Sequence, residues 1–369
     1  MPDVELVNVT KKYGKQLALD NISLKIKDGE YTVICGPTGA GKTTLLLLLA
    51  GLIKPDSGEI YFDGELVNDK LPEDRNVGLM FETFALFPHL NVIRNVTYGP
   101  WVRGKNLEHA FESGKEILEL MHLSGWETAY PDELSGGMRQ RVSLARALVA
   151  ESKILLLDEP FGALDAKIKM ELRYEMKNLA TSLRLTAIHA TYDVEESMMM
   201  ADKVVIINKG KIEQVGTPME IYEHPATMFV ANYITEANFL EGVLISKEKD
   251  KSVVELSFGE KIVTAPSNIP LNERVAVFIR SEDFNLIPLN KYEEAEGLVG
   301  KIADLVFMGG FSRFEIELEE TDTLIVVKKL GDIFKNYKEG QRVRLIYPTA
   351  RAYLYKLQSG ISLNQAISV

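Results

Sequence analysis

Strand-like and helix-like segments alternate along roughly the first two thirds of the chain. Short apolar runs at 31–35, 154–157 and 204–207 predict strands that are buried on both faces of a sheet. A leucine-rich stretch from Thr43 predicts a helix, and the stretch 104–124 predicts another because its apolar residues recur with helical spacing. The alternation predicts an α/β domain with a mostly parallel sheet.

After about Glu236 the pattern changes to short β-rich runs separated by turn residues. The runs 275–279, 324–327 and 343–347 are of this kind. Runs at this spacing predict a small closed or half-open β-barrel. The sequence therefore predicts two domains, residues 1–235 and 236–369, with a boundary near 233–240.

The composition agrees with a folded two-domain protein and argues against several other classes. A chain of 369 residues exceeds the size at which a single core stops growing, and 46% hydrophobic with 26% charged residues is typical of globular proteins. The net charge of −11 argues against a nucleic-acid partner. The single cysteine, Cys35, excludes an intramolecular disulfide and a multi-cysteine zinc site. No signal-peptide pattern opens the sequence, and the longest apolar run, 45–53, is too short to span a bilayer. We expect a cytosolic protein, or one that docks onto a membrane protein from the cytosol.

A glycine-rich segment after the first of these buried strands matches the pattern of a phosphate-binding loop. Its glycines let the loop curl so that backbone N–H groups point inward at phosphate oxygens. Lys42 is then placed to reach the β- and γ-phosphates, and the Thr43 hydroxyl to bind Mg²⁺. Because the segment follows a predicted strand and opens a predicted helix, a chance match is the weaker interpretation. It consists of Gly36, Pro37, Thr38, Gly39, Ala40, Gly41, Lys42 and Thr43.

Two further motifs fit beside such a loop. The strand at 154–157 ends in Asp158 and Glu159, which places one carboxylate near a metal ion and the other near an attacking water. Alone, this ending would be interpreted as two solvated acids. Ser135, Gly136 and Gly137 precede a predicted helix, where backbone N–H groups can receive an anion. Alone, they are equally well explained as a flexible loop.

In combination and order, these motifs resemble those of the ATP-binding-cassette family. The loop 36–43, the signature 134–138, the acidic strand 155–159 and the segment 163–165 stand in family order. The resemblance covers essentially the whole chain. It implies a P-loop nucleotide-binding cassette, with a mostly parallel sheet and a helical subdomain at about 84–150, followed by a small OB-like β-barrel.

The resemblance also implies ligands. Mg²⁺ and ATP would be sandwiched at two sites of a head-to-tail dimer of ATPase subunits. Each site would combine the loop of one subunit, continuing to Thr44, with Ser135, Gly136 and Gly137 of the other. Tyr13 stands where the family keeps an aromatic ring that stacks on adenine. Thr43, Asp158 and the residue at position 82 would hold the metal.

The implied partners are integral-membrane permease subunits. Segments 72–78 and 84–89 are typical of ATPases of maltose and glycerol-phosphate importers, so a sugar or a related polyol or phosphate is the expected solute. The chain would lie peripherally at the cytoplasmic face of the cell membrane, with an extracytoplasmic solute-binding protein as an indirect partner. Permease helices would dock in a groove lined by 84–89. Ordinary core packing explains Phe84, Leu86 and Phe87 equally well.

At two positions the sequence departs from the family. Glu82 replaces a glutamine and Tyr192 replaces a histidine, and both missing residues normally face the γ-phosphate of the same ATP. A second anion about 4 Å from another costs roughly 4 kcal/mol at an effective dielectric of 20. Tyr192 keeps a hydroxyl but places it farther out than an imidazole, and losing one donor to the transition state typically costs ~10²–10³ in rate.

These departures predict a weakened catalytic site, in which Glu159, Tyr192 and Glu82 would be the catalytic residues. His189 cannot replace the missing histidine, because an odd offset from Tyr192 on a strand turns it to the opposite side, so we interpret it as structural. The chain would then pair with a fully equipped sister ATPase. A homodimer with slow hydrolysis is the rival interpretation. A regulatory protein that binds ATP without powering transport is the alternative from another class.

Overall fold

The computed structural model describes residues 2–290, 297–319, 321–331 and 333–368. The chain forms two compact units, of which the first runs to His224 and the second begins at Pro225. The boundary inferred from the sequence lies farther along, beyond helix α9 (Met228–Ile234). This helix contacts the C-terminal helix α10 (Leu363–Ser368), and the Tyr355 hydroxyl donates to the Pro225 carbonyl (2.8 Å), so α9 packs as part of the second unit.

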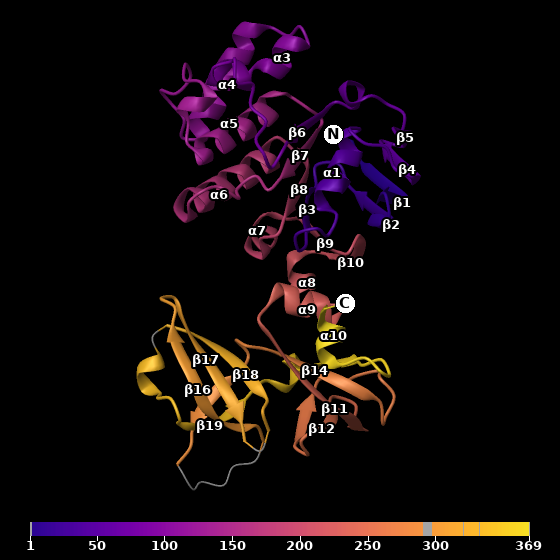
Figure 1. Ribbon diagram of the computed structural model, residues 1–369, viewed down its shortest axis with the longest axis vertical. Coiled ribbons are helices and arrows are strands. Elements are labelled where there is room, and N and C mark those ends of the chain that lie inside the picture. The colour runs from indigo at the N-terminus through magenta and orange to yellow at the C-terminus, as the bar shows by residue number, and fades with distance from the viewer. Residues whose placement is uncertain (1, 291–296, 320, 332, 369) are drawn as a thin grey trace. The chain divides into compact units, whose positions relative to one another are not determined.

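The first unit is built on a six-stranded sheet of order β10-β9-β3-β8-β7-β6 (Figure 1). All neighbours are parallel except β9 and β10, which confirms the expected mostly parallel sheet. The strands are β3 (Tyr31–Cys35), β6 (Val77–Met80), β7 (Ile154–Asp158), β8 (Thr186–Thr191), β9 (Lys203–Asn208) and β10 (Lys211–Gly216).

A second, antiparallel sheet lies on the other side of helix α1 (Lys42–Ala50). The leucines of α1 contribute to one buried core with residues of both sheets, which explains why this helix is apolar on nearly all sides. The strands of the second sheet are β1 (Val4–Tyr13), β2 (Gln16–Ile26), β4 (Ser57–Phe62) and β5 (Glu65–Leu66).

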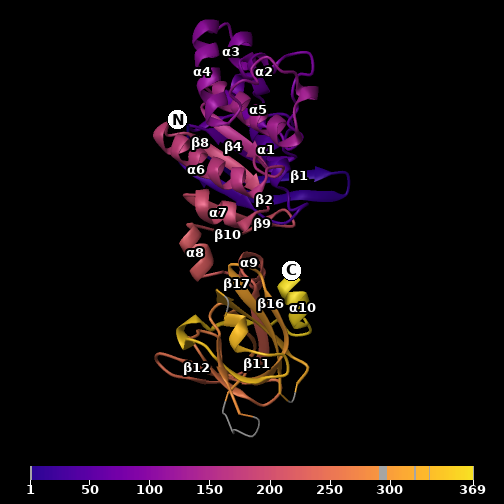
Figure 2. The ribbon, with the colours of Figure 1, turned by 90° about the vertical axis from the view of Figure 1, so that its left-hand side faces the viewer.

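Helices α6 and α7 pack side by side, and α7 contacts β3 and β8 of the parallel sheet (Figure 2). The first unit also contains a 3₁₀ turn before β6 and a short helix after β10. The bounds are α6 (Ala166–Ser182), α7 (Val194–Met200), α8 (Pro218–Glu223) and the turn Pro72–Arg75.

A helical segment is inserted between β6 and β7, where the helical subdomain was expected. Its longest exposed helix buries Ala110, Gly114 and Leu118 on one face, as the helical spacing of its apolar residues predicts. The helices are α2 (Val92–Val96), α3 (Tyr98–Val102), α4 (Leu107–Leu120) and α5 (Gly136–Val149), with a 3₁₀ turn at Pro131–Glu133.

The second unit consists of two antiparallel five-stranded sheets that share one apolar core. This agrees with the expected β-rich domain. One sheet has the order β13-β12-β11-β14-β20, with strands Lys261–Thr264, Ser252–Leu256, Ala237–Lys247, Arg274–Arg280 and Tyr353–Lys356. The other has the order β15-β19-β16-β17-β18, with strands Asn285–Pro288, Arg342–Ile346, Val299–Phe307, Phe311–Leu318 and Leu324–Leu330. Two 3₁₀ turns lie at Ile333–Asn336 and Thr349–Arg351. No helix in the described ranges combines the length and apolar character needed to cross a bilayer.

The register of the parallel sheet decides what meets at its carboxyl edge. Cys35 of β3 pairs with Thr191 of β8, and Asp158 of β7 pairs with Ala190. The residues that follow these strands therefore emerge side by side, although they lie far apart in the sequence. Ligand sites in such sheets form at this edge.

Candidate functional site

The glycine-rich loop between β3 and α1 has the shape that its sequence predicts. Gly41 adopts a left-handed conformation (φ 108°), and a Cβ there would lie 2.5 Å from the Ala18 carbonyl oxygen. At Gly36 a Cβ would lie 2.2 Å from the Ile207 carbonyl oxygen. Both positions therefore require glycine. The N-terminus of α1 has no side-chain cap, so its N–H groups are available to an anion.

Lys42 closes this loop from within. Its ammonium donates to the carbonyl oxygens of Gly36 (2.8 Å) and Pro37 (3.1 Å) and lies 4.0 Å from a carboxylate oxygen of Glu159. The side chain is almost fully buried. Its charge is therefore fixed at the centre of the loop, beside the carboxyl edge of the sheet.

A pocket of about 280 Å³ opens over the loop. It brings together most of the residues that the sequence singled out and adds Gln16 and Ala18 of β2. Gly36, Pro37 and Ala40 belong to the loop without lining the pocket. Tyr13 lies at the rim with about half of its surface exposed. The lining residues expected from the sequence are Tyr13, Thr38, Gly39, Gly41, Lys42, Thr43, Thr44, Glu82, Asp158, Glu159 and Tyr192.

Asp158 fits the role of a cation ligand. Burial raises the pKa of its carboxyl group, the negative charge of Glu82 adds to this shift, and a hydrogen bond with Thr43 opposes it. One oxygen, Oδ1, is buried with no hydrogen-bond partner among the described residues. An orphaned carboxylate oxygen beside a threonine hydroxyl suits Mg²⁺, which takes one or two protein oxygens together with substrate phosphates. Among the described residues no three acidic, histidine or cysteine side chains cluster so as to hold a metal ion.

Glu159 is held in an unusual conformation. Its backbone is left-handed (φ 48°), which costs about 1–2 kcal/mol for a residue with a Cβ. Its N–H donates to the Ala190 carbonyl (2.9 Å), and its carboxylate accepts from the Thr191 hydroxyl (3.2 Å). Burial raises the pKa of the carboxyl group to about 7, against the opposing influence of Lys42. The group is thus poised between its two protonation states near neutral pH.

The two residues that depart from the family both line the pocket. Glu82 is exposed and near enough to Asp158 to raise the pKa of that carboxyl group. Tyr192 is 54% exposed and follows the end of β8. Both lie in the same pocket as Asp158 and Glu159, and that they face one nucleotide stays a prediction.

His189 is structural, as expected from its strand position. It is fully buried, its Nδ1 lies 3.2 Å from the Tyr31 hydroxyl, and its Nε2 lies 3.3 Å from a carboxylate oxygen of Glu196. Burial acts to raise the pKa of Glu196, but His189 and Arg173 outweigh this and lower it. Arg173 also binds Asp193 (2.6 Å), so the network fastens the segment that follows Tyr192.

The signature residues lie outside the pocket of Lys42. Ser135 caps α5, with its hydroxyl accepting from the Met138 N–H (3.3 Å), while Gly136 and Gly137 are partly exposed in the first turn. None of the three lines the pocket over the loop. This is the arrangement expected if they serve the site of a second subunit.

Sequence reasoning missed two residues that contact Glu159. Thr191 binds its carboxylate, and Gln140 of α5 donates to its carbonyl (2.9 Å). In the sequence, Thr191 and Gln140 each appear only as a polar residue in a segment whose other residues are mostly expected to be buried. Such a signal does not reveal what the side chain binds.

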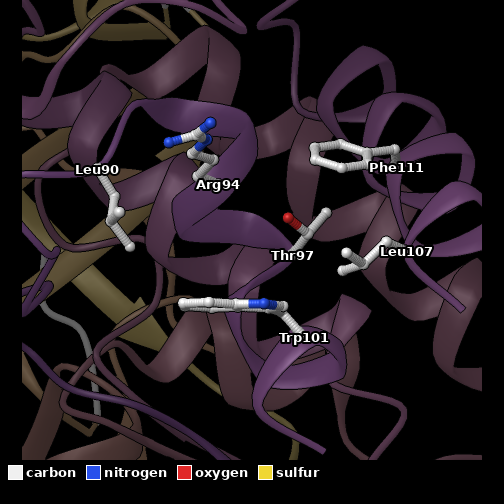
Figure 3. Close-up of a pocket in the computed structure, with 6 residues that line it drawn as sticks. All are labelled: Leu90, Arg94, Thr97, Trp101, Leu107 and Phe111. Carbon is white, nitrogen blue, oxygen red and sulfur yellow. The ribbon is translucent and has the colours of Figure 1, made fainter. Parts of the chain in front are cut away.

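A second pocket, of about 330 Å³, lies in the helical segment (Figure 3). Figure 3 shows the Trp101 indole along one side, with Leu107 and Phe111 across from Leu90. The segment 84–89 does not line this pocket, so a permease groove there stays a prediction. Phe87 packs on Tyr98 with ring centroids 4.3 Å apart, a contact of the kind that core packing predicts. This pocket, the helical groove, is lined by Leu90, Arg94, Thr97, Trp101, Leu107 and Phe111.

Two family models match the chain. The ABC transporter model matches residues 19–162, a range that contains the phosphate loop, Glu82, the signature and Asp158–Glu159. The TOBE domain model matches residues 277–354, within the second unit.

Curated relatives extend the similarity to almost the whole chain. The spermidine/putrescine import ATP-binding protein PotA of Acetivibrio thermocellus is 40% identical over 307 residues, which cover 83% of this chain and 84% of the relative. The protein of the same name from Clostridioides difficile is 38% identical over 352 residues, which cover 94% and 95%. These names do not support the expected assignment to maltose or glycerol-phosphate importers.

Solved structures support the cassette fold. A dimeric structure of MJ0796, described as a bacterial ABC transporter cassette, matches with a TM-score of 0.55 and 32% identity and covers 58% of this chain and 98% of its own. The same cassette in a post-hydrolysis state bound to ADP and Pi gives a TM-score of 0.54. The chain therefore belongs to the ABC transporter family, in which ATP hydrolysis is coupled to transport, as the Mg·ATP-binding subunit of an importer with a TOBE domain, which dimerises and partners with membrane permease subunits.

Proposed function

We propose that this chain powers the import of polyamine-type solutes from the cytoplasmic face of the membrane. The observation that carries the proposal is the convergence of Lys42, Thr43, Asp158 and Glu159 on one pocket at the carboxyl edge of the sheet. The solute class rests on the relatives that are named for spermidine and putrescine import. It replaces the sugar expected from the sequence.

The pocket residues divide the work of ATP binding. We assign Tyr13 to stacking on adenine and the loop N–H groups with Lys42 to the phosphates, because these groups surround the uncapped N-terminus of α1. Thr43, Asp158 and Glu82 would hold Mg²⁺, which neutralises phosphate charge when bound. Glu159 orients the attacking water and accepts its proton, a role that suits a carboxyl group whose pKa is about 7.

Within this function we propose that the site is catalytically weakened. Glu82 adds a third carboxyl group to a pocket that already holds Asp158 and Glu159. Its charge works against ionisation of Asp158, the same ionisation that a metal ligand needs. Tyr192 presents a phenol where an imidazole would donate to the developing charge. Both changes act on the same nucleotide.

The signature residues support a division of labour between two different ATPase subunits. Ser135, Gly136 and Gly137 are intact and lie outside the weakened pocket. In a head-to-tail dimer they would complete the site of the other subunit. We therefore propose a heterodimer. This chain would bind ATP at a site with weak or no hydrolysis, and it would support hydrolysis by a sister subunit that carries glutamine and histidine at the positions of Glu82 and Tyr192.

A regulatory protein that binds ATP without hydrolysis is the second candidate. The TOBE domain, which could bind an effector, keeps this candidate open. The buried, strained placement of Glu159 favours transport, because a sensor has no need to maintain a carboxylate in that position.

The experiment that tests the weakened site is steady-state Mg·ATP hydrolysis by the purified chain. We expect little turnover from the unmodified chain and a rise of about tenfold or more in the Glu82→Gln/Tyr192→His double variant, because a neutral ligand and an imidazole donor are restored. Glu159→Gln in the same background is the control and removes the gain.

Each other outcome has a definite meaning. If the unmodified chain turns over and Glu159→Gln abolishes that turnover, the weakened-site proposal is wrong and a homodimer follows. If the double variant binds ATP but stays silent, the regulatory alternative is favoured.

The helical groove is the proposed docking surface for a permease segment. Its lining is mostly apolar, with Trp101 55% and Leu107 41% exposed and Arg94 at the edge. Exposed aromatic and aliphatic side chains around a concave surface fit an amphipathic helix. A basic residue at the rim favours an acidic group on that helix.

A further inference from the structure

One buried polar side chain in α5 joins two parts of the candidate site. Gln140 is 1% exposed, and both ends of its carboxamide are used. The nitrogen donates to the carbonyl oxygen of Glu159 (2.9 Å), and the oxygen accepts from the N–H of Ala163 (2.9 Å). A buried carboxamide with both ends bonded fixes the two backbone segments relative to its own helix.

The backbone that Gln140 holds is the one that presents the Glu159 carboxylate. Glu159 is left-handed, and such a conformation persists only where the surroundings enforce it. Three hydrogen bonds do so: its N–H donates to Ala190, and its carbonyl accepts from Gly162 (3.2 Å) and from Gln140. Only the bond from Gln140 comes from outside the sheet edge and the turn itself.

The other end of the connection is the signature turn. Gln140 lies one helical turn after Gly137, in the helix that Ser135 caps. The loop after Glu159, which contains Ala163 and Leu164, packs on this first turn. A Cβ at Gly137 would lie 3.3 Å from the Leu164 side chain and 3.5 Å from the Ala163 carbonyl oxygen. The loop and the start of α5 thus touch twice, once through Gly137 and once through the Gln140 carboxamide.

We propose that Gln140 is a positioning residue that links the two ATP sites of the dimer. It ties the backbone that presents Glu159 to this chain's own ATP to the helix that presents Ser135–Gly137 to the partner's ATP. A shift of α5 on closure over one nucleotide is thereby passed to the carboxylate at the other. The inference rests on the proposed function, since it takes from there the assignment of the signature to the partner's site.

Two substitutions separate the two ends of the carboxamide. Gln140→Met has nearly the same volume and neither donates nor accepts. Gln140→Glu keeps an acceptor for Ala163 and, when ionised, has no donor for the Glu159 carbonyl. The matched control is Asn238→Asp in the second unit, because Asn238 is 5% exposed and its carboxamide also donates to one carbonyl and accepts from one N–H, both of Val326 (2.8 Å each).

The kinetic readout is kcat and KM for ATP, measured in the unmodified chain or, if that is silent, in the Glu82→Gln/Tyr192→His background. We expect both variants to lower kcat about 10- to 100-fold, as misplacement of a reacting group does. KM should stay within about twofold, and the retained Ala163 bond should give Gln140→Glu no rescue. Three results would overturn the inference: an unchanged kcat, a fall in kcat accompanied by a rise in KM of more than about twofold, or the same fall in kcat in Asn238→Asp.

Hydrogen–deuterium exchange decides the case if neither background turns over. We expect Mg·ATP to protect the segments 134–142 and 156–166 together in the unmodified chain. In Gln140→Met the two segments should no longer respond together, and unchanged joint protection would refute the link. An unmodified chain that fails to bind ATP at all contradicts the proposed function, whereas normal binding with indifferent Gln140 variants contradicts only this inference.

Discussion

The Glu159 carboxyl group occupies a position that disfavours its charge. Its side chain is mostly buried, and burial raises its pKa from the ordinary value of 4.5 to about 7. In the unfolded chain this group would release its proton near pH 4.5. Between about pH 4.5 and about pH 7, the folded, nucleotide-free protein therefore keeps a proton that the unfolded chain has lost. Stability therefore falls as the pH rises from about 4.5 through about 7.

Glu159→Gln should remove this pH dependence in the nucleotide-free and Mg²⁺-free chain. The shift corresponds to roughly 3 kcal/mol of unfolding free energy at most, present as a penalty above pH 7 and absent near pH 4.5. We expect the variant to unfold at higher urea concentration than the unmodified chain at pH 8, and at the same concentration at pH 4.5. Glu195→Gln, at a side chain that is 84% exposed, is the control and should change neither midpoint. Equal midpoints at pH 8 would show that burial does not strain this carboxyl group.

At the residue scale, the sequence supports a prediction where chemistry demands a particular residue type. A phosphate loop needs glycines and a lysine at fixed spacing, so Gly36, Gly41 and Lys42 were identifiable. Gln140 and Thr191 were not, because a glutamine in a helix and a threonine at a strand end satisfy local propensity whatever they bind. Their partners are set by tertiary packing, which no spacing rule encodes.

The turn that follows Glu82 holds two adjacent residues in a strained backbone conformation. Phe84 (φ 64°) and Ala85 (φ 44°) are consecutive left-handed residues that are not glycine. Arg146 of α5 donates to both of their carbonyl oxygens (3.1 and 2.9 Å), and Ser143 donates to that of Phe84 (2.8 Å). Without these donors from α5 the turn would relax, and Glu82 would lose its fixed position.

Arg146→Lys should loosen this turn, because an ammonium group cannot make the planar, forked contact to two carbonyl groups. We expect a loss of about 1–3 kcal/mol in unfolding free energy and faster hydrogen exchange across residues 82–90. Arg103→Lys is the control, since Arg103 makes one exposed bond to the Ala150 carbonyl (2.8 Å) in the same helical segment. Equal exchange in the two variants would mean that Arg146 does not hold the turn.

Elements were predictable where their pattern is local. The strand at 31–35 matches β3, and the stretch 104–124 contains α4. The boundary between the two units could not be predicted from a local pattern. Helix α9 follows the cassette in sequence yet packs with α10 at the far end of the chain, so its membership depends on contacts between distant residues.

The two units have separate cores, and the surfaces that a transporter subunit needs lie on the first of them. The phosphate loop, the signature turn and the helical groove all belong to residues before His224. The second unit supplies a TOBE domain with its own apolar core. On the proposed function, ATP binding and permease docking both belong to the first unit. Because the pocket over the phosphate loop and the helical groove share no lining residue, a mutation in one leaves the residues of the other in place.

Trp101→Ala tests that independence. We expect ATP affinity to be unchanged and association with the permease subunits in the reconstituted transporter to weaken by about tenfold or more, as for a buried aromatic anchor. Trp126→Ala is the matched control, because it removes the other of the two tryptophans of the chain, one that is 42% exposed and outside the helical groove. A transporter that assembles normally with Trp101→Ala would place the docking surface elsewhere.

The exposure of the pocket residues determines which of them can be substituted during evolution without harming the fold. Lys42 and Asp158 are buried and bonded within the loop and sheet edge, so their loss would harm folding as well as chemistry. Glu82 and Tyr192 lie on the exposed side of the pocket, where a substitution costs the fold little. If these two residues serve turnover as proposed, a lineage can lose hydrolysis at these positions while it keeps a folded subunit that binds ATP. An intact phosphate loop would then report on folding and ATP binding alone, and the residues at the exposed rim would report on turnover.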